Sequence, residues 1–235
     1  MVNPREISLS RCFAEGWEAF KAYPWLTIGG YAIYSVIGWV ASHIPGINVL
    51  YFILAVFPLA GGFITLLLKI LRRSNPRLED LFDGFKDWVK WMGVGWLLIL
   101  YVLIALIICG IPAAILVTIA DFILGANSAD GKIMIVIGGI ITLVLLLIIL
   151  MRWVFVYYVA ADGANATQSI RGSTDLTEGI RFKLFWMLLV ISLFAISGMV
   201  ALFIGIFFTG AIAQCAVTAL YLDVRQARTS PAPDI

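Results

Sequence analysis

The sequence predicts an all-α polytopic membrane protein, in which six transmembrane helices form three hairpins and an amphipathic interfacial helix precedes each hairpin. The chain is 62% hydrophobic and only 13% charged, which is about half the charged fraction of a soluble domain. Its apolar residues gather into the segments 25–41, 49–68, 96–119, 133–151, 185–202 and 205–222. Each is close to the roughly 20 residues that cross a hydrocarbon core of about 30 Å.

These segments are expected to be helices. Isolated strands in lipid would leave backbone N–H and C=O groups unpaired, which costs several kcal/mol for each group. The alternation of apolar and polar residues that marks a membrane β-barrel does not occur in the sequence.

The basic residues predict the orientation. Of the 16 Lys and Arg residues, all except Lys132 precede the first segment, follow the last, or lie between segments two and three or four and five. Basic residues are enriched on the cytoplasmic side of membrane proteins. Both termini are therefore predicted to be cytoplasmic, which requires an even number of crossings.

The approaches to the odd-numbered segments resemble one another. Each has an acidic residue, a glycine and a large apolar residue, with the glycines at Gly16, Gly84 and Gly179. Amphipathic helices of this kind lie in the headgroup plane. We expect three units of one helical domain, at about 6–72, 75–162 and 165–225, followed by a disordered cytoplasmic tail over 226–235. An internal repeat of this kind is an architectural clue in membrane folds.

Helix starts can be assigned within the second and third units. Asn75 before Pro76 is a candidate cap for the second interfacial helix, and Ser173 or Asp175 is a candidate cap for the third. The stretch "STDLTEGIRFKLFW" (173–186) is expected to lie on the cytoplasmic surface and then turn into segment five, with Gly179 at the bend or at a close helix contact. Gly16 and Gly84 are expected in equivalent places.

The last pair of segments is short for two crossings. Residues 185–222 must supply two spans and a turn, slightly less than the roughly 40 residues that two full crossings need. Two short crossings with local thinning of the bilayer would suffice. A hairpin that enters and leaves on the cytoplasmic side also agrees with the distribution of charge. Two crossings are the preferred interpretation.

Segment six is predicted to be the centre of the helix bundle. Ala211, Cys215 and Ala219 recur every four residues, and small residues of this kind allow helices to approach closely in lipid. The polar residues Thr209, Gln214 and Thr218 are expected to make interhelical hydrogen bonds. Segment four, which is larger and entirely apolar, is expected to face lipid.

A resemblance to a known family lies in the stretch "RWVFVYYVAADGANATQSIRGSTDLTEGIRFKLFWMLL" (152–189). It resembles uncharacterised bacterial membrane proteins related to the membrane domain of some glycerophosphodiester phosphodiesterases. The resemblance implies about six spans and a place in the bacterial cytoplasmic (inner) membrane. It rests on an arginine that closes a span, an acidic residue, a serine, Leu-Thr, a glycine and an aromatic residue, here Arg152, Asp162, Ser173, Leu176, Thr177, Gly179 and Trp186.

The sequence offers no catalytic, cofactor or metal site. It contains one histidine, His43, in the short outer turn "SHIPG". It has no paired His/Glu metal spacing, no Gly-rich phosphate loop and no serine nucleophile with a base partner. The three cysteines are widely separated and are expected to be packing residues. We therefore expect a protein that is not an enzyme and that needs no cofactor.

The expected function is that of a scaffold, an assembly factor or a partner-binding subunit of the inner membrane. Its partners would be membrane lipids and either another membrane protein or further copies of the chain, without nucleic acid. The alternative is a small-solute or lipid transporter. A transporter should contain a polar cavity near Gln214 that reaches the middle of the membrane. A scaffold should instead have a filled core and an exposed docking face.

Overall fold

A computed structural model describes residues 7–124, 129–200 and 204–229 of the chain, and every regular element within these ranges is helical. Short and long helices are interspersed along the chain. The elements are α1 (Leu9–Ala22), α2 (Pro24–His43), α3 (Ile47–Leu54), α4 (Val56–Leu71), the 3₁₀ helix η1 (Leu78–Phe85), α5 (Trp88–Leu124), α6 (Ala129–Leu150), η2 (Met151–Trp153), α7 (Val156–Ala161), α8 (Ala166–Thr177), α9 (Arg181–Ser197), η3 (Gly198–Val200) and α10 (Ile204–Thr229).

Several of these helices are long and apolar enough to cross a membrane. Within the described residues, three stretches meet this condition alone, namely Trp88–Ile119, Ile135–Ala161 and Gly205–Thr229. The number rises to five if the bent pairs α3–α4 and α8–α9 are each counted as one span. The chain is thus a helical membrane protein, while the six crossings and their pairing as hairpins stay a prediction.

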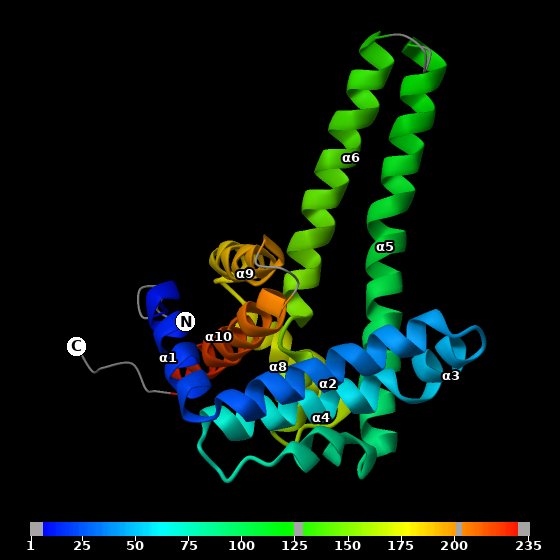
Figure 1. Ribbon diagram of the computed structural model, residues 1–235. Coiled ribbons are helices and arrows are strands. Elements are labelled where there is room, and N and C mark those ends of the chain that lie inside the picture. Colours follow the sequence, from blue (N-terminus) through cyan, green and yellow to red (C-terminus); the bar gives the residue numbers. More distant parts are fainter. Residues whose placement is uncertain (1–6, 125–128, 201–203, 230–235) are drawn as a thin grey trace.

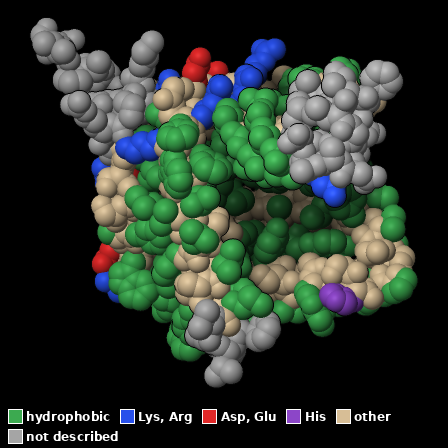
Figure 2. All heavy atoms as spheres, turned by 90° about the horizontal axis from the view of Figure 1, so that it is seen from above, with side chains coloured by type: hydrophobic (Ala, Val, Ile, Leu, Met, Phe, Trp, Pro, Cys, Tyr) green, Lys and Arg blue, Asp and Glu red, His purple; other side chains and the backbone are tan. Residues whose placement is uncertain are grey.

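The molecule consists of a compact base and a projecting pair of helices (Figure 1). We call α5 and α6 the hairpin, and all other elements the base. In Figure 1 the hairpin stands upright while α2 and α4 lie across the view, so the helices do not form one bundle of parallel rods. On the face seen down the hairpin, apolar side chains are widespread (Figure 2).

The hairpin is rooted in the base through the start of α5. Trp91 and Val94 are buried and pack with Val156 and Ala160 of α7 and Ile170 of α8. The sequence placed the start of this span at residue 96, but the helix already begins at Trp88. Its 37 residues rise about 55 Å, well beyond the thickness of a hydrocarbon core. The first turns of α5 therefore belong to the base.

Helix α10 is the centre of the base, as the sequence predicted. The side chains of Ala211, Cys215 and Ala219 are completely buried. Helix α10 packs against α1, α2, α4, α8 and α9. Small side chains permit these close contacts, and burial of apolar groups gives no driving force of its own when the alternative is lipid.

Helix α6 is exposed where α10 is buried, which agrees with the prediction that segment four faces lipid. None of its most apolar window, which lies within Ile135–Ala161, is buried inside the protein. Ile133, Ile137, Ile140 and Val144 recur at helical spacing along its outer face, and all are about half exposed.

Two of the three polar side chains on α10 make the expected hydrogen bonds. The Thr209 hydroxyl donates to the carbonyl of Ala195 on α9 at 2.8 Å. The Thr218 hydroxyl lies 3.4 Å from that of Tyr158 on α7, and it also donates to the carbonyl of Gln214 in its own helix. Gln214 itself is half-buried.

The predicted helix caps were wrong. The second short helix starts at Leu78 and not at Asn75, and the Asp80 carboxylate caps it by accepting from the Arg77 N–H at 2.7 Å. Asn75 has a positive φ of 47° and belongs to the preceding turn. Helix α8 begins after Asn165, whose side chain forms a capping box with Gln168. Ser173 and Asp175 therefore lie inside α8.

The limits of the third interfacial helix and of the tail also need correction. The stretch 173–186 contains the end of α8, a sharp turn and the start of α9, so the bend at Gly179 lies where the sequence predicted it, while the helix before the bend begins earlier, after Asn165. The axes of α8 and α9 differ by 97°. Residues 226–229, predicted to be part of a disordered tail, continue α10 to Thr229. The remainder of that tail lies outside the described residues.

A leucine at Ala219 tests the central position of α10. We expect Ala219→Leu to lower the melting temperature in detergent, because overpacking a closely packed core costs about 1–3 kcal/mol. The matched control is Val136→Leu on the exposed part of α6, which should leave the melting temperature almost unchanged. Equal tolerance of the two substitutions in thermal unfolding would contradict the assignment of α10 as the core helix.

Candidate functional site

A buried carboxylate joins three parts of the base at one point. Asp162 follows α7, and its Oδ1 lies 2.7 Å from a guanidinium nitrogen of Arg72 at the end of α4. Its Oδ2 accepts a hydrogen bond from the Tyr221 hydroxyl at 2.6 Å and is also paired with Arg225. We call these four residues the Asp162 junction. Tyr221 and Arg225 are one helical turn apart, so the same face of α10 provides both contacts.

The junction holds Asp162 in its charged form. Burial alone would raise the pKa of the Asp162 carboxyl, but the hydrogen bonds from Arg72 and Tyr221 outweigh burial and hold this pKa below its usual value. Both carboxylate oxygens are occupied by donors within the protein. A carboxylate in this state is well suited to fastening helices together and poorly suited to accepting a proton from a substrate.

Ser173 performs a second fastening role, where the chain passes from η2 to α7. Its hydroxyl donates to the carbonyl of Arg152 at 2.8 Å and accepts from the N–H of Phe155 at 3.2 Å. The serine is completely buried, so it pairs two backbone groups in the interruption between two helical segments. Thr177, also completely buried, donates to the carbonyl of Thr174 within α8.

Gly16 lies at a backbone contact within a continuous helix, and the bend of the first unit is elsewhere. A Cβ atom on Gly16 would come within 2.8 Å of the amide nitrogen of Ala216, so α1 can rest on α10 only with glycine here. The bend lies at Tyr23, before Pro24 starts α2. One turn before Gly16, the Cys12 thiol donates to Asp223 of α10 over 3.6 Å.

Gly84 makes the matching contact in the second unit. A Cβ atom here would collide with the backbone of Pro58 and Gly62 on α4. One turn before it, Asp80 forms a 2.7 Å ion pair with Lys69. Asp80 precedes Gly84 by the same four positions that separate Cys12 from Gly16. Lys69 follows Gly62 by the same seven positions that separate Asp223 from Ala216. The two units thus share one contact geometry.

Gly179 does not share this contact, and its expected equivalence was wrong. It lies in the turn between α8 and α9 with φ of 78°, a conformation that side chains disfavour, and no atom outside the turn lies near its missing Cβ. At Gly172 of α8 a Cβ would lie 3.0 Å from the side chain of Val159 of α7, which is not the backbone contact made at Gly16 and Gly84. The acid-Gly pair that marks a helix contact at Gly16 and Gly84 therefore marks a turn at Gly179.

The site residues predicted from the sequence therefore do not form one site but lie at separate helix contacts. Ser173 is hydrogen-bonded to the backbone of Arg152, and Asp162 lies nearby at the end of α7. Gly179 is close to the end of α10, where Arg228 donates to the carbonyl of Glu178 at 2.6 Å. Gly16, Gly84 and Gln214 belong to other helix contacts. Sequence reasoning missed Arg72, Tyr221 and Arg225, although the four-residue spacing of Tyr221 and Arg225 was a visible signal.

The buried thiol of Cys12 shows why the cysteines serve packing. Burial, followed by the nearby charge of Asp223, raises the pKa of the Cys12 thiol to about 12. A thiol in this state stays neutral at physiological pH and is a weak nucleophile. The three cysteines are all free. Within the described residues, no group of His, Cys, Asp and Glu side chains could hold a metal ion.

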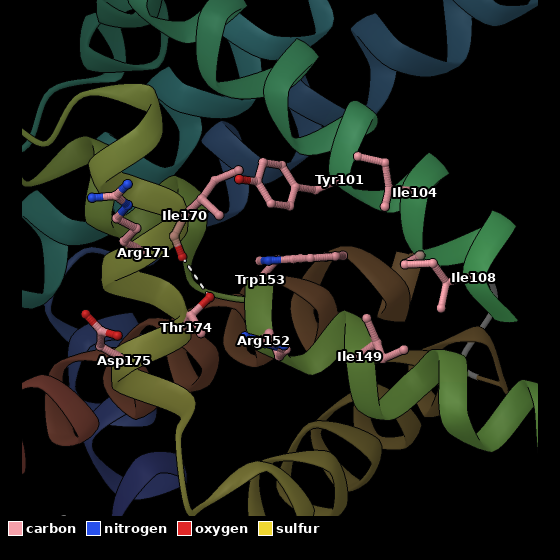
Figure 3. A pocket seen from close by; sticks show the side chains of 11 residues that line it. Tyr101, Ile104, Ile108, Ile149, Arg152, Trp153, Ile170, Arg171, Thr174 and Asp175 are labelled. Atoms are coloured by element: carbon pink, nitrogen blue, oxygen red, sulfur yellow. Dashed lines mark hydrogen bonds between the residues drawn. The ribbon is translucent and has the colours of Figure 1, made fainter.

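A groove lies between α5 and α8, beside the end of α6. We call it the α5–α8 groove; it has a volume of about 490 Å³. In Figure 3, Tyr101 and Trp153 point into it, while Ile104 and Ile108 extend along the α5 side. Its lining combines apolar and aromatic residues of α5 and α6 with Arg152, Trp153, Arg171 and Asp175.

Comparison with known families identifies the family of the chain. A family model described as a domain of unknown function (DUF7847) matches residues 9–232. The chain belongs to this family. The match includes every helix from α1 to α10, so base and hairpin are parts of one family unit. No curated protein and no solved structure matches the chain.

Neutralising Asp162 tests the junction. We expect Asp162→Asn to lower the free energy of unfolding by about 1–3 kcal/mol, because Arg72 and Arg225 lose their shared counter-ion. Asp175→Asn, which changes an exposed acid on α8, is the control and should have little effect.

The pH dependence of the stability of the same variant tests whether the charge of Asp162 stabilises the junction. The pKa of Asp162 is lowered by folding, so its contribution is complete above the unfolded value of about 3.9 and is lost as the pH falls through the folded value. The difference in melting temperature between the wild type and Asp162→Asn should therefore shrink below about pH 4. A difference that stays constant down to pH 2 would show that Asp162 acts through its shape alone.

Proposed function

We propose that the protein is a non-catalytic membrane scaffold or partner-binding subunit, in which the base holds the hairpin as a docking arm within the bilayer. The observation that carries this proposal is the separation of the hairpin from the base (Figure 1). Beyond Tyr101, the large side chains of α5 are mostly exposed, and so are those of α6. Another transmembrane helix could pack against this surface without displacing any part of the chain.

The packing around α10 favours a scaffold over a transporter. The sequence suggested that a transporter would open a polar cavity near Gln214. Its neighbours Ala211, Ala213, Cys215 and Ala216 are instead buried against other helices. Three charged groups of the base, Lys69, Asp162 and Asp223, are paired near helix ends. A substrate path through a membrane protein usually carries such groups at mid-depth.

The proposal includes the orientation and the location expected from the sequence. Both termini face the cytoplasm and the protein lies in a bacterial inner membrane, since the basic residues cluster on one side of the apolar segments. The relationship to the membrane domain of glycerophosphodiester phosphodiesterases is part of the same proposal. It rests on the residues of the 152–189 stretch, of which Asp162 and Ser173 have structural roles in the base.

Chemical labelling of Cys215 separates the two classes of function. In a variant with Cys12→Ser and Cys109→Ala, Cys215 is the remaining thiol, and it is completely buried on α10. We expect no reaction with a small charged methanethiosulfonate in intact membranes, followed by full reaction after denaturation. A cysteine at exposed Ser74 in the cysteine-free background is the positive control. Labelling of Cys215 at the rate of that control would reveal an aqueous path along α10 and support transport.

Photo-crosslinking tests the docking arm itself. A photoreactive amino acid is placed at Ile137 or Ile140 on α6 and at Ile107 or Ile111 on α5, all of which are exposed. Irradiation of native membranes should give a discrete protein adduct from one helix face, because a docked helix covers only part of the hairpin. Val94, buried in the base, serves as the control and should give none. Lipid adducts alone from all four exposed positions would refute a protein partner at the hairpin.

A further inference from the structure

The α5–α8 groove has an apolar wall of regular spacing. Tyr101, Ile104 and Ile108 recur at intervals of three and four residues, so they lie on one face of α5. Ile149 of α6 lies across from them, and the Tyr101 ring meets the Trp153 ring edge to face with centroids 5.6 Å apart. In Figure 3, Ile104 and Ile108 follow one another along α5, as contacts to a hydrocarbon chain lying along the helix would.

The mouth of the groove carries an excess of positive charge. Arg152 and Arg171 line it, together with a single acid, Asp175. No salt bridge among the described residues involves any of these three side chains. The Nε atom of Arg152 is buried and has no hydrogen-bond partner. The Nε atoms of Arg181 and Arg228 are in the same state. What favours an external anion at the groove is therefore the pair of guanidinium charges, Arg152 and Arg171, that form no salt bridge within the described residues.

The level of the mouth agrees with the headgroup region of a bilayer. Residues 101–124 of α5 rise about 36 Å and the 22 residues of α6 about 33 Å, both close to the thickness of a hydrocarbon core. Tyr101, Arg152 and Trp153 stand at the inner end of these stretches. Tyr and Trp are enriched at this boundary, and arginine extends its charge from it into the headgroups.

We propose that the α5–α8 groove binds a single glycerophospholipid, with its phosphate at Arg152 and Arg171 and one acyl chain along Tyr101, Ile104 and Ile108. The planar guanidinium group matches the oxygens of a phosphate, and the two arginines exceed the one carboxylate by a positive charge. The apolar wall selects a lipid over a free phosphate ion. This ligand site stands apart from the proposed docking role of the hairpin and does not require it.

Native mass spectrometry of the delipidated full chain in detergent measures this binding. The protein is titrated with phosphatidylglycerol, and in parallel with a diacylglycerol that has the same acyl chains and no phosphate. We expect one phosphatidylglycerol to be retained and the diacylglycerol to bind more weakly. Arg152→Gln and Arg171→Gln should each weaken binding about fivefold. This is the contribution that one basic residue makes to binding at an anionic lipid surface.

Two matched variants distinguish a specific lipid site from general electrostatic attraction of anionic lipid to the protein. Arg73→Gln removes the same charge from an exposed position after α4 that does not line the groove, and it should leave binding unchanged. Ile104→Trp keeps both arginines but fills the apolar wall, and it should reduce phosphatidylglycerol binding as much as Arg152→Gln. If Arg152→Gln fails to fold, Arg171→Gln and Ile104→Trp still decide the question, because both positions are exposed.

The proposal fails under any of three results. Equal weakening by Arg73→Gln and Arg171→Gln would indicate diffuse electrostatic attraction. Equal retention of phosphatidylglycerol by Ile104→Trp and the wild type would show that the wall holds no acyl chain. Displacement of the lipid by inorganic phosphate at millimolar concentration would identify a site for a free anion.

Discussion

Close backbone contact between short and long helices is the constraint on which the base depends. Helices in lipid gain little from apolar burial, so they associate through tight packing and polar contacts. Gly16 lets α1 reach the backbone of α10, and Gly84 lets η1 reach that of α4. Each contact is secured one turn away by a polar pair, Cys12 with Asp223 and Asp80 with Lys69. A side chain at either glycine would separate the backbones and also pull the polar pair apart.

The same arrangement connects the ends of the chain. Each short helix packs on a helix of another unit: η1 on α4, α8 on α7, and α1 on α10. The last of these contacts joins the first unit to the third, so the base closes on itself. Asp162 adds a cross-link between the ends of α4, α7 and α10. Paired charges thus hold the helix ends of the base.

The sequence predicted local features well and long-range partners poorly. Apolar segments and the small face of α10 could be recognised because they depend on hydropathy and helical spacing alone. The partners of Asp162 could not, since Arg72 lies far away in the sequence and no periodic pattern joins the two. The third glycine was misassigned because an acid-Gly pair occurs both in a helix, at Gly16, and in a turn, at Gly179. The groove was also missed, because α5 and α8 meet only in the folded chain.

The continuity of α5 gives the protein a mechanical property. One helix runs from Trp88 in the base to Leu124 near the far end of the hairpin, and Pro112 is its only interior proline. An α-helix resists bending because bending strains its backbone hydrogen bonds, and a proline removes one of them. The part of α5 before Pro112 therefore acts as a stiff lever. A change in the tilt of the hairpin is transmitted to Lys90, whose ammonium group holds the Ala160 carbonyl at 2.7 Å.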